Sequence, residues 1–317
     1  MDFSFSEEQT LLRNTIQSFL QDNYDFDSRK AIIQSEDGMS KENWQQLAEL
    51  GLLGVPFSEA DGGLDFGPVE TMIVAEEFGK GLVIEPYIQT VVTCGGFLRR
   101  GSEEQRQEHL SKIISGEEIW AFAHAEPQGR FNLSDIKVTA SKNNDEYSLN
   151  GHKCVVSGAP WAQKLIVSAR TSGDQSDQDG ISLFIVDKSA EGVSLRDYKT
   201  VDGSMASEVT FENVKVDPSS IIGEEGKAYN LIELVVDETI AALCAEAIGA
   251  MSVLNDATVE YCKTRKQFGQ PIGKFQVLQH RMVDMFMQYE QSVSMTYMVN
   301  LKSVSYTHLT LPTTGVV

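Results

Sequence analysis

One stretch near the end of the chain combines residue types that suit a phosphorylated ligand. It reads Arg265-Lys266-Gln267-Phe268-Gly269, and Gln276 follows it. The guanidinium of Arg265 is a planar fork of hydrogen-bond donors that matches a pyrophosphate. Gln267 can bond an adenine or phosphate edge, and the ring of Phe268 can stack on a base. A charged helix end followed by an ordinary turn would give the same pattern, so this motif alone is only modestly specific.

Two apolar runs end in residues that could contact a planar polar ring. The first, from Trp120 to Pro127, could offer backbone amides and carbonyls, or it could be an edge strand closed by proline. Its His124, taken alone, is more often a structural histidine than a catalyst. The second, from Gly151 to Gly158, places the Ser157 hydroxyl where it could bond a cofactor edge, or it forms a hairpin with a bulge.

These motifs need elements to position them, and hydrophobic periodicity divides the chain into three parts. Residues 1–118 read as helical, with capping boxes at Ser6–Gln9 and Ser102–Gln105 and helices over 41–50 and 69–78. Residues 119–222 carry short alternating runs separated by Gly, Asn and Asp clusters, which predicts a β-sandwich or barrel. From 223 to 302 the helical period returns, with one helix over about 227–265 and another from near Phe275. The predicted fold class is α+β.

The last residues do not continue this pattern. Residues 303–317 are rich in threonine, carry Pro312 and lose the apolar stripe of the helix before them. Two interpretations stay open: a natural β-like tail, or a foreign or frame-shifted tail on a C-terminally truncated chain. The uninterrupted reading frame after Lys302 would separate them.

Composition limits the classes of partner. The chain has 317 residues and a net charge of -20, so its surface repels nucleic-acid phosphates and anionic lipid. No stretch is apolar enough to span a membrane, no secretory signal begins the chain, and no metal-ligand pattern is found. The cysteines, which form no C-x-x-C pair, predict free thiols in a reducing compartment. We therefore expect a cytoplasmic protein without nucleic-acid, membrane or metal partners.

Taken together, the motifs resemble the acyl-CoA dehydrogenase family in order and spacing. The resemblance covers about residues 3–302 and rests on a glycine-rich loop at 51–63, Glu126-Pro127, Asn150-Gly151-His152-Lys153, and the segments 214–223 and 261–276. Within the family, Glu126-Pro127-Gln128-x-Arg130 and the run 243–247 are similar to the branch of pimeloyl-CoA dehydrogenase small subunits. The resemblance implies an N-terminal helical domain, a middle β domain and a C-terminal helical bundle, which would be incomplete here.

The resemblance also implies FAD as cofactor and assigns residues to it. The backbone of Phe122, Ala123, His124 and Ala125 would flank the flavin ring, and Ser157 would bond near its reactive nitrogen. Arg265, Gln267, Phe268 and Gln276 would reach the pyrophosphate and adenine of FAD held by a neighbouring subunit. A shared cofactor implies a homo- or hetero-oligomer, a dimer or tetramer.

The implied reaction is the α,β-dehydrogenation of an acyl-CoA to the trans-2-enoyl-CoA, as in fatty acid metabolism. Electrons would pass to an electron-transferring flavoprotein. Two other functions stay open: a non-catalytic partner subunit of a heteromeric dehydrogenase, and a flavin monooxygenase or oxidase on the same fold.

This chain departs from the family pattern at three places. Arg130 stands where many members have a small Gly-Ser-Asp segment, and it would supply local positive charge for the substrate or stay a solvated surface residue. The position of a catalytic glutamate in some members is taken by Thr239, so the base is unknown and Glu246 is a weak candidate. The more usual base region lies in the family beyond Lys302, and we expect the chain as given to bind FAD weakly and turn over little.

Overall fold

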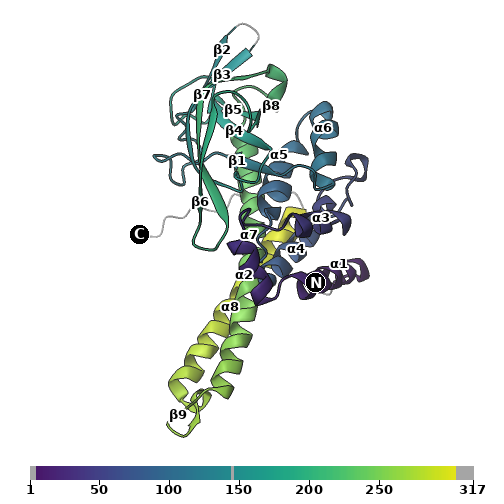
Figure 1. Cartoon of the computed structure of the whole chain (residues 1–317), viewed down its shortest axis with the longest axis vertical. Helices are drawn as coiled ribbons and strands as arrows, with labels where there is room; N and C mark the ends of the chain where they lie inside the picture. The colour runs from purple at the N-terminus through teal and green to yellow at the C-terminus, as the bar shows by residue number, and fades with distance from the viewer. Residues whose placement is uncertain (1–4, 144–145, 305–317) are drawn as a thin grey trace. The chain divides into compact units, whose positions relative to one another are not determined.

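The computed structural model describes residues 5–143 and 146–304. The order of elements is helices, then strands, then helices, which confirms the predicted fold class (Figure 1). The described residues divide into two compact units, each built from separate stretches of the chain. The first unit contains residues 5–18, 66–82 and 241–304, and the second contains residues 19–65 and 83–240. The boundaries predicted at 118/119 and 222/223 stay predictions.

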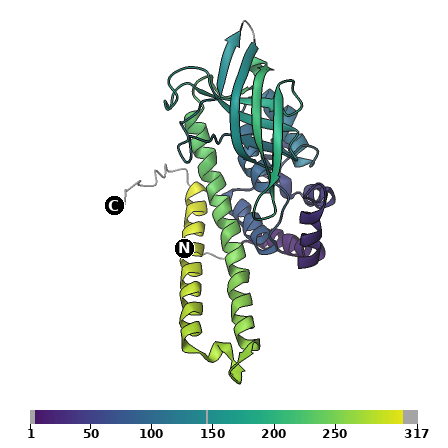
Figure 2. The ribbon, with the colours of Figure 1, turned by 60° about the vertical axis from the view of Figure 1, so that its left-hand side comes forward.

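The first unit is helical. It holds most of α1 (Glu7–Asn23), all of α4 (Pro68–Gly81), the later part of α7 (Tyr229–Thr264), and α8 (Gln276–Val304). The later part of α7 and α8 run antiparallel (Figure 2). They are joined by a small hairpin of β9 (Lys266–Gln267) and β10 (Gln270–Pro271) and by a 3-10 turn, Ile272–Lys274.

Two glycines let α4 and α7 pack with their backbones in contact. A Cβ atom placed on Gly79 would lie 1.9 Å from the carbonyl oxygen of Glu246, and one placed on Gly249 would lie 1.9 Å from that of Glu76. Since any side chain would push the helices apart, these positions require glycine. Arg13 of α1 adds an ion pair to Glu76 at 3.2 Å and another to Glu77 at 3.1 Å.

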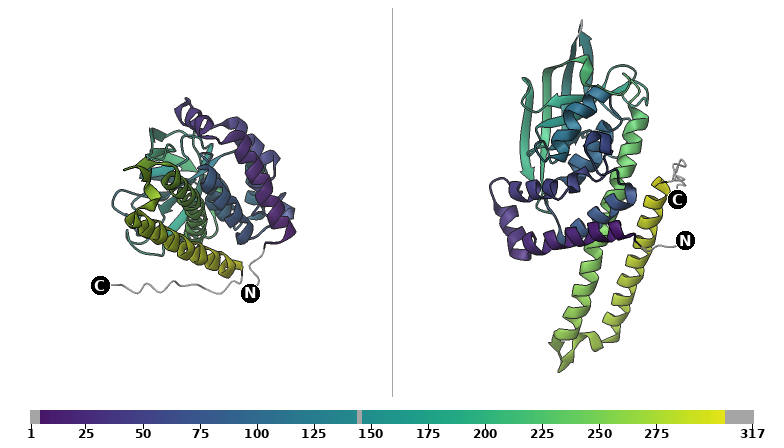
Figure 3. Two further views of the ribbon diagram at one scale, coloured as in Figure 1. Left: turned by 90° about the horizontal axis from the view of Figure 1, so that it is seen from below. Right: turned by 90° about the vertical axis from the view of Figure 1, so that its right-hand side faces the viewer.

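The second unit begins with short helices. They are α2 (Phe26–Gln34), α3 (Lys41–Glu49), two 3-10 turns at Leu52–Gly54 and Glu59–Asp61, the π-helix Ile88–Cys94, α5 (Gly95–Leu98) and α6 (Glu103–Ile114). Helices α5 and α6 lie on one face of the sheet (Figures 1 and 3). The amide of Gln105 on α6 donates to the carbonyl oxygens of Ser219 and Ile221, both at 2.9 Å, which holds α6 to the end of the sheet.

Eight strands of the second unit form one sheet. They are β1 (Trp120–Ala123), β2 (Thr139–Asn143), β3 (Glu146–Ser157), β4 (Lys164–Arg170), β5 (Ile181–Asp187), β6 (Val193–Lys199), β7 (Met205–Val216) and β8 (Ile221–Ile222). The order is β6-β7-β3-β2-β4-β5-β8, and β1 pairs with β4 in parallel. A 3-10 turn, Pro218–Ser220, precedes β8. The core is densest at β4 and β5, where nearly every residue is buried.

Most predicted local features are confirmed. Both capping boxes form: the Gln9 amide donates to Ser6 Oγ at 3.1 Å, and the Gln105 amide donates to Ser102 Oγ at 3.2 Å. The helices predicted over 41–50, 69–78, 227–265 and from Phe275 are present as α3, α4, α7 and α8. The periodicity did not predict α2 or the π-helix. Helix α8 continues to Val304, and residues 305–317, which hold most of the predicted foreign tail, lie outside the described residues.

Two findings bear on the predicted environment. None of the helices in the described part of the chain is long and apolar enough to cross a membrane. All four cysteines are free thiols; Cys94 and Cys262 are buried, Cys154 is half-buried and Cys244 is exposed. The cytoplasmic location stays a prediction.

Candidate functional site

Strand β1 lies at an edge of the sheet. It pairs with β4 and with no other strand of the described chain. Trp120, Ala121 and Ala123 are buried, whereas Phe122 and His124 are half-buried. Side chains two residues apart share a face of a strand, and these two rings stack with centroids 5.1 Å apart. Thus β1 is the edge strand that one interpretation predicted. The other interpretation, in which its backbone amides and carbonyls contact a planar ring, stays a prediction.

Ser157 ends β3 beside a bulge. The pairing of β3 with β7 shifts register between Lys153 and Val156, and Val155 within the shift has a positive φ of 51°. The predicted bulge is therefore present. The amide of Cys154 donates to the carbonyl oxygen of Ala125 at 2.8 Å, which ties the bulge to the residue after β1. Ser157 Oγ accepts a hydrogen bond from Gln89 Nε2 at 3.2 Å, so its own hydrogen is left to donate.

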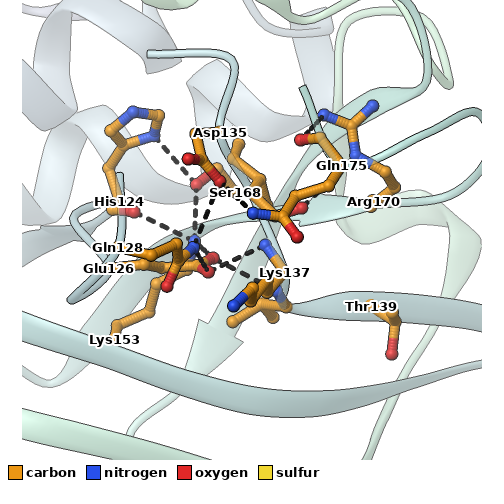
Figure 4. A network of polar contacts seen from close by, with 12 residues as sticks. His124, Glu126, Gln128, Asp135, Lys137, Thr139, Lys153, Ser168, Arg170 and Gln175 are labelled. Atoms are coloured by element: carbon orange, nitrogen blue, oxygen red, sulfur yellow. Dashed lines mark hydrogen bonds and ion pairs between the residues drawn. The ribbon is translucent and has the colours of Figure 1, made fainter. Parts of the chain in front are cut away.

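A buried charged network holds the chain where β1 ends (Figure 4). Lys153 of β3 is fully buried, and its ammonium donates to Glu126 Oε1 at 2.7 Å, to the His124 carbonyl oxygen at 3.0 Å and to Ser168 Oγ at 3.0 Å. Glu126 also accepts from the backbone amides of Lys137 and Val138. Because a buried charge needs such partners, this network fixes the backbone after Phe122 firmly.

The same burial sets the charge states of the network. Burial, and then the positive charge of Lys153, lower the pKa of His124 from its ordinary 6.5 to about 3, so its imidazole is neutral. Burial lowers the pKa of Lys153 to about 8, against the opposing effect of Glu126. Burial alone would raise the pKa of Glu126, but the charge and hydrogen bond of Lys153 outweigh it and hold that pKa below its ordinary value.

The early part of α7 brings Glu238 and Thr239 beside the π-helix and α5. Glu238 is bound by two guanidinium groups, Arg99 at 2.7 Å and Arg100 at 2.5 Å. The Thr239 hydroxyl donates to the Val235 carbonyl oxygen at 2.8 Å and lies 2.9 Å from the Thr93 hydroxyl. Thr239 has no acidic group, and the carboxylate next to it is already paired, so neither is a free base.

The π-helix is the element of this site that sequence reasoning missed. Its Gln89 reaches Ser157, its Thr90 accepts from the Trp120 amide at 3.2 Å and donates to the Trp120 carbonyl oxygen at 3.0 Å, and its Thr93 reaches Thr239. π-helical turns are rare and often occur at functional sites. The available signal was three polar residues, at positions 89, 90 and 93, in an otherwise apolar run.

The residues proposed for the adenine end lie in the first unit. Phe268 and Gly269 form the two-residue tip of the β9–β10 hairpin, with φ angles of 52° and 78°, as a type I′ turn requires. Phe268 is 91% exposed, although a positive φ is strained for a non-glycine residue. Arg265, Gln267 and Gln276 are exposed as well. An exposed aromatic ring on a strained, well-formed turn is typical of a binding surface.

Arg130 and Glu246 are the two remaining residues that the sequence analysis proposed for the site. Arg130 lies in the loop after β1, is exposed, has a φ of 47°, and has no ion-pair partner within the described residues. Its neighbour Phe131 is 99% exposed. Glu246 is half-buried on α7 in the first unit, where its carbonyl faces Gly79. Roles for Arg130 in substrate binding and for Glu246 in catalysis stay predictions.

The second unit thus holds Phe122, His124, Ser157 and Thr239, while the first unit holds Arg265, Gln267, Phe268 and Gln276 at or near the β9–β10 hairpin. Three family models match consecutive parts of this chain. The N-terminal domain of acyl-CoA dehydrogenase matches residues 6–117, its middle domain matches 121–214, and its C-terminal domain matches 232–303.

Individual proteins are similar over most of the chain. Mitochondrial isovaleryl-CoA dehydrogenase of Pongo abelii is 34% identical over 288 residues, which are 89% of this chain and 68% of that protein. The Bacillus subtilis (strain 168) protein named "Probable acyl-CoA dehydrogenase YngJ" is 30% identical over 302 residues, 92% of this chain and 77% of that protein. The solved FAD complex of PigA superposes with a TM-score of 0.90 at 28% identity, covering 97% of this chain and 82% of that one.

Proposed function

Because the chain belongs to the acyl-CoA dehydrogenase family, we propose that it takes part in the FAD-dependent α,β-dehydrogenation of an acyl-CoA to the trans-2-enoyl-CoA. The observation that carries the proposal is the edge strand β1, on which the side chains of Phe122 and His124 are only half-buried. The physiological electron acceptor we propose is an electron-transferring flavoprotein.

The residues around β1 fit a flavin. A flavin ring has wide apolar faces and an edge of carbonyl and ring-nitrogen acceptors. Phe122 supplies an apolar surface, and the Ser157 hydroxyl has a hydrogen left to donate because Gln89 already occupies its oxygen. The chemistry supplied by a bound flavin is acceptance of the β-hydride of the acyl chain at N5. The chain's own contribution is a rigid strand, fixed by Lys153 and Thr90, that orients the ring.

The hairpin at the end of α7 fits the other end of a dinucleotide. The Arg265 guanidinium suits a pyrophosphate, and the exposed Phe268 ring can stack on adenine. We propose that these groups serve the cofactor of a neighbouring subunit. The active assembly is then an oligomer in which each site is completed by two chains.

One observation supports a second candidate, a non-catalytic partner subunit. The position that carries the base in some relatives is Thr239, and the carboxylate beside it, Glu238, is neutralised by Arg99 and Arg100. A carboxylate held by two guanidinium groups is poorly suited to remove an α-proton, although the chain can still complete the cofactor site of another subunit.

Anaerobic flavin reduction tests the proposal. The purified chain, alone and co-expressed with the product of a neighbouring acyl-CoA dehydrogenase gene, is loaded with FAD and mixed with straight-chain, branched and dicarboxylyl CoA thioesters. Loss of flavin absorbance with release of enoyl-CoA by the chain alone supports the enzyme. Turnover by the heteromer together with inactivity of the chain alone, restored by Thr239→Glu, supports the partner subunit.

Two further results would contradict the proposal. Absence of bound flavin from both preparations would remove its basis. Rapid reoxidation of the reduced, product-bound flavin by air would instead indicate an oxidase or monooxygenase.

A further inference from the structure

The surroundings of Lys153 provide one acceptor for each hydrogen of its ammonium group. An ammonium group has three hydrogens and no acceptor capacity. Lys153 is completely buried, and three oxygens lie within hydrogen-bond distance of its Nζ: Glu126 Oε1, the His124 carbonyl and Ser168 Oγ. Each oxygen therefore accepts one hydrogen. It follows that Ser168 Oγ acts as an acceptor toward Lys153, which leaves its own hydrogen to be placed.

The contacts of Ser168 also indicate which atom accepts its hydroxyl hydrogen. Ser168 is fully buried, and its Oγ lies 2.9 Å from His124 Nδ1. Among the residues that the structure describes, no other acceptor for this hydrogen is found. Leaving a buried hydroxyl hydrogen without an acceptor is costly, so Ser168 donates to Nδ1. A neutral imidazole that accepts at Nδ1 carries its hydrogen on Nε2.

The second nitrogen of His124 is turned away from this network. Figure 4 shows the ring with one nitrogen directed at Ser168 and the other on the far side from Lys153. Nε2 has no hydrogen-bond partner within residues 5–143 and 146–304, and the ring is half-buried and stacks on Phe122, on the same face of β1. The network therefore presents one N–H group on that face.

We infer that Lys153 and Ser168 are positioning residues that hold His124 in its neutral Nε2–H form, so that β1 offers a hydrogen-bond donor to an acceptor atom of the flavin ring. The identity of the ligand rests on the proposed function, whereas the tautomer rests on the contacts within the chain. A donor held at this place would stabilise negative charge on a reduced flavin ring.

The tautomer can be measured without any ligand. Protein labelled with ¹⁵N-histidine is examined by long-range ¹H–¹⁵N NMR at neutral pH, and the His124→Gln variant identifies the His124 signals. We expect an unprotonated Nδ1 and a protonated Nε2. Ser168→Ala should give a mixture of tautomers, and Ser168→Thr, which keeps the hydroxyl, should restore the single form.

Several outcomes would overturn the inference. A protonated Nδ1 in the unmodified chain would do so, and so would a Ser168→Ala variant whose His124 signals are unchanged. If Ser168→Ala does not fold, as judged by circular dichroism, the tautomer of the unmodified chain decides by itself.

The ligand is tested in a second step. Adding FAD to the labelled chain should move the His124 Nε2 signal, and His124→Phe should shift the absorption bands of the bound flavin. A signal that moves only when acyl-CoA is added would assign the donor to the thioester carbonyl and overturn the flavin contact. If the unmodified chain binds no FAD, the proposed function and the flavin contact fail together, whereas the tautomer result stands.

Discussion

The ammonium of Lys153 lies 2.7 Å from the carboxylate of Glu126, and their side chains are 0% and 2% exposed. Removing one partner of a buried ion pair leaves an uncompensated charge, which costs about 3–5 kcal/mol. We therefore expect Lys153→Met to lower the free energy of unfolding by about that amount. Urea unfolding with an unchanged slope measures it.

Two further variants serve as controls for this prediction. Combining Lys153→Met with Glu126→Gln removes both charges and should cost less than Lys153→Met alone. The exposed pair Lys263–Glu260, with side chains 63% and 66% exposed, is the matched control. Lys263→Met should cost less than about 1 kcal/mol. If Lys153→Met and Lys263→Met lower the free energy of unfolding equally, burial does not determine the cost of breaking the pair.

Stability should also depend on pH through His124. Its pKa is about 3 in the folded chain and 6.5 ordinarily, because burial and Lys153 disfavour the charged ring. As the pH falls from 6.5 to 3, His124 binds a proton in the unfolded chain but not in the folded chain. The free energy of unfolding therefore falls with the pH. The slope from this group is at most about 1.4 kcal/mol per pH unit.

The measurement is the urea midpoint between pH 4 and 7. The His124→Gln variant should show a shallower decline than the unmodified chain, because its share of the proton linkage is gone. His280→Gln, a change at an exposed histidine, is the control. Parallel profiles for all three chains would show that His124 is protonated equally in both states.

Gly249 tests the close packing of α4 on α7. In a helix, changing glycine to alanine ordinarily stabilises by up to about 1 kcal/mol. Here the new Cβ would lie 1.9 Å from the Glu76 carbonyl oxygen, so the backbones must separate. We expect Gly249→Ala to destabilise by about 1–3 kcal/mol net. Gly54→Ala, whose Cβ would be 3.4 Å from its nearest neighbour, should stay within about 1 kcal/mol. A stabilised Gly249→Ala would refute the contact.

Arg265 should contribute to FAD affinity without contributing to stability. It is exposed at the end of α7, and a hydrogen bond to a charged group is worth about 1.5–3 kcal/mol. Arg265→Ala should therefore weaken FAD binding about 10- to 100-fold in the oligomer, measured by flavin fluorescence titration. Lys263→Ala, which removes the same charge nearby, controls for general electrostatics. The proposed contact fails if both variants weaken binding equally.

Glu238 should not act as the base. Its carboxylate is engaged by Arg99 and Arg100, and neutralising it would remove both ion pairs. We expect Glu238→Gln to lower the melting temperature and to leave the rate of acyl-CoA-dependent flavin reduction within about threefold. A decrease in that rate of a hundredfold or more, which is typical of removing a general base, would indicate that Glu238 is the base.

Many local structural features of this protein could be predicted from its sequence. The capping boxes at Ser6 and Ser102 act over three residues, and the helical period of 227–265 repeats within a single element. In each case the determinant and its consequence lie a few residues apart, so the amino-acid order was sufficient. The family resemblance rested on other short motifs, such as Glu126-Pro127 and the segment 261–276, which are equally local.

Tertiary structure decided the contacts that join distant residues. Lys153 meets Glu126 across 27 positions and Ser168 across 15, and Arg100 meets Glu238 across 138. Periodicity carries no information about such pairs, because they depend on the order of strands in the sheet and on how α7 passes α5. The sequence analysis predicted that Thr239 takes the position of a catalytic glutamate in some family members. Only the fold showed that the neighbouring carboxylate is paired, because a charge is neutralised by what lies near it in space.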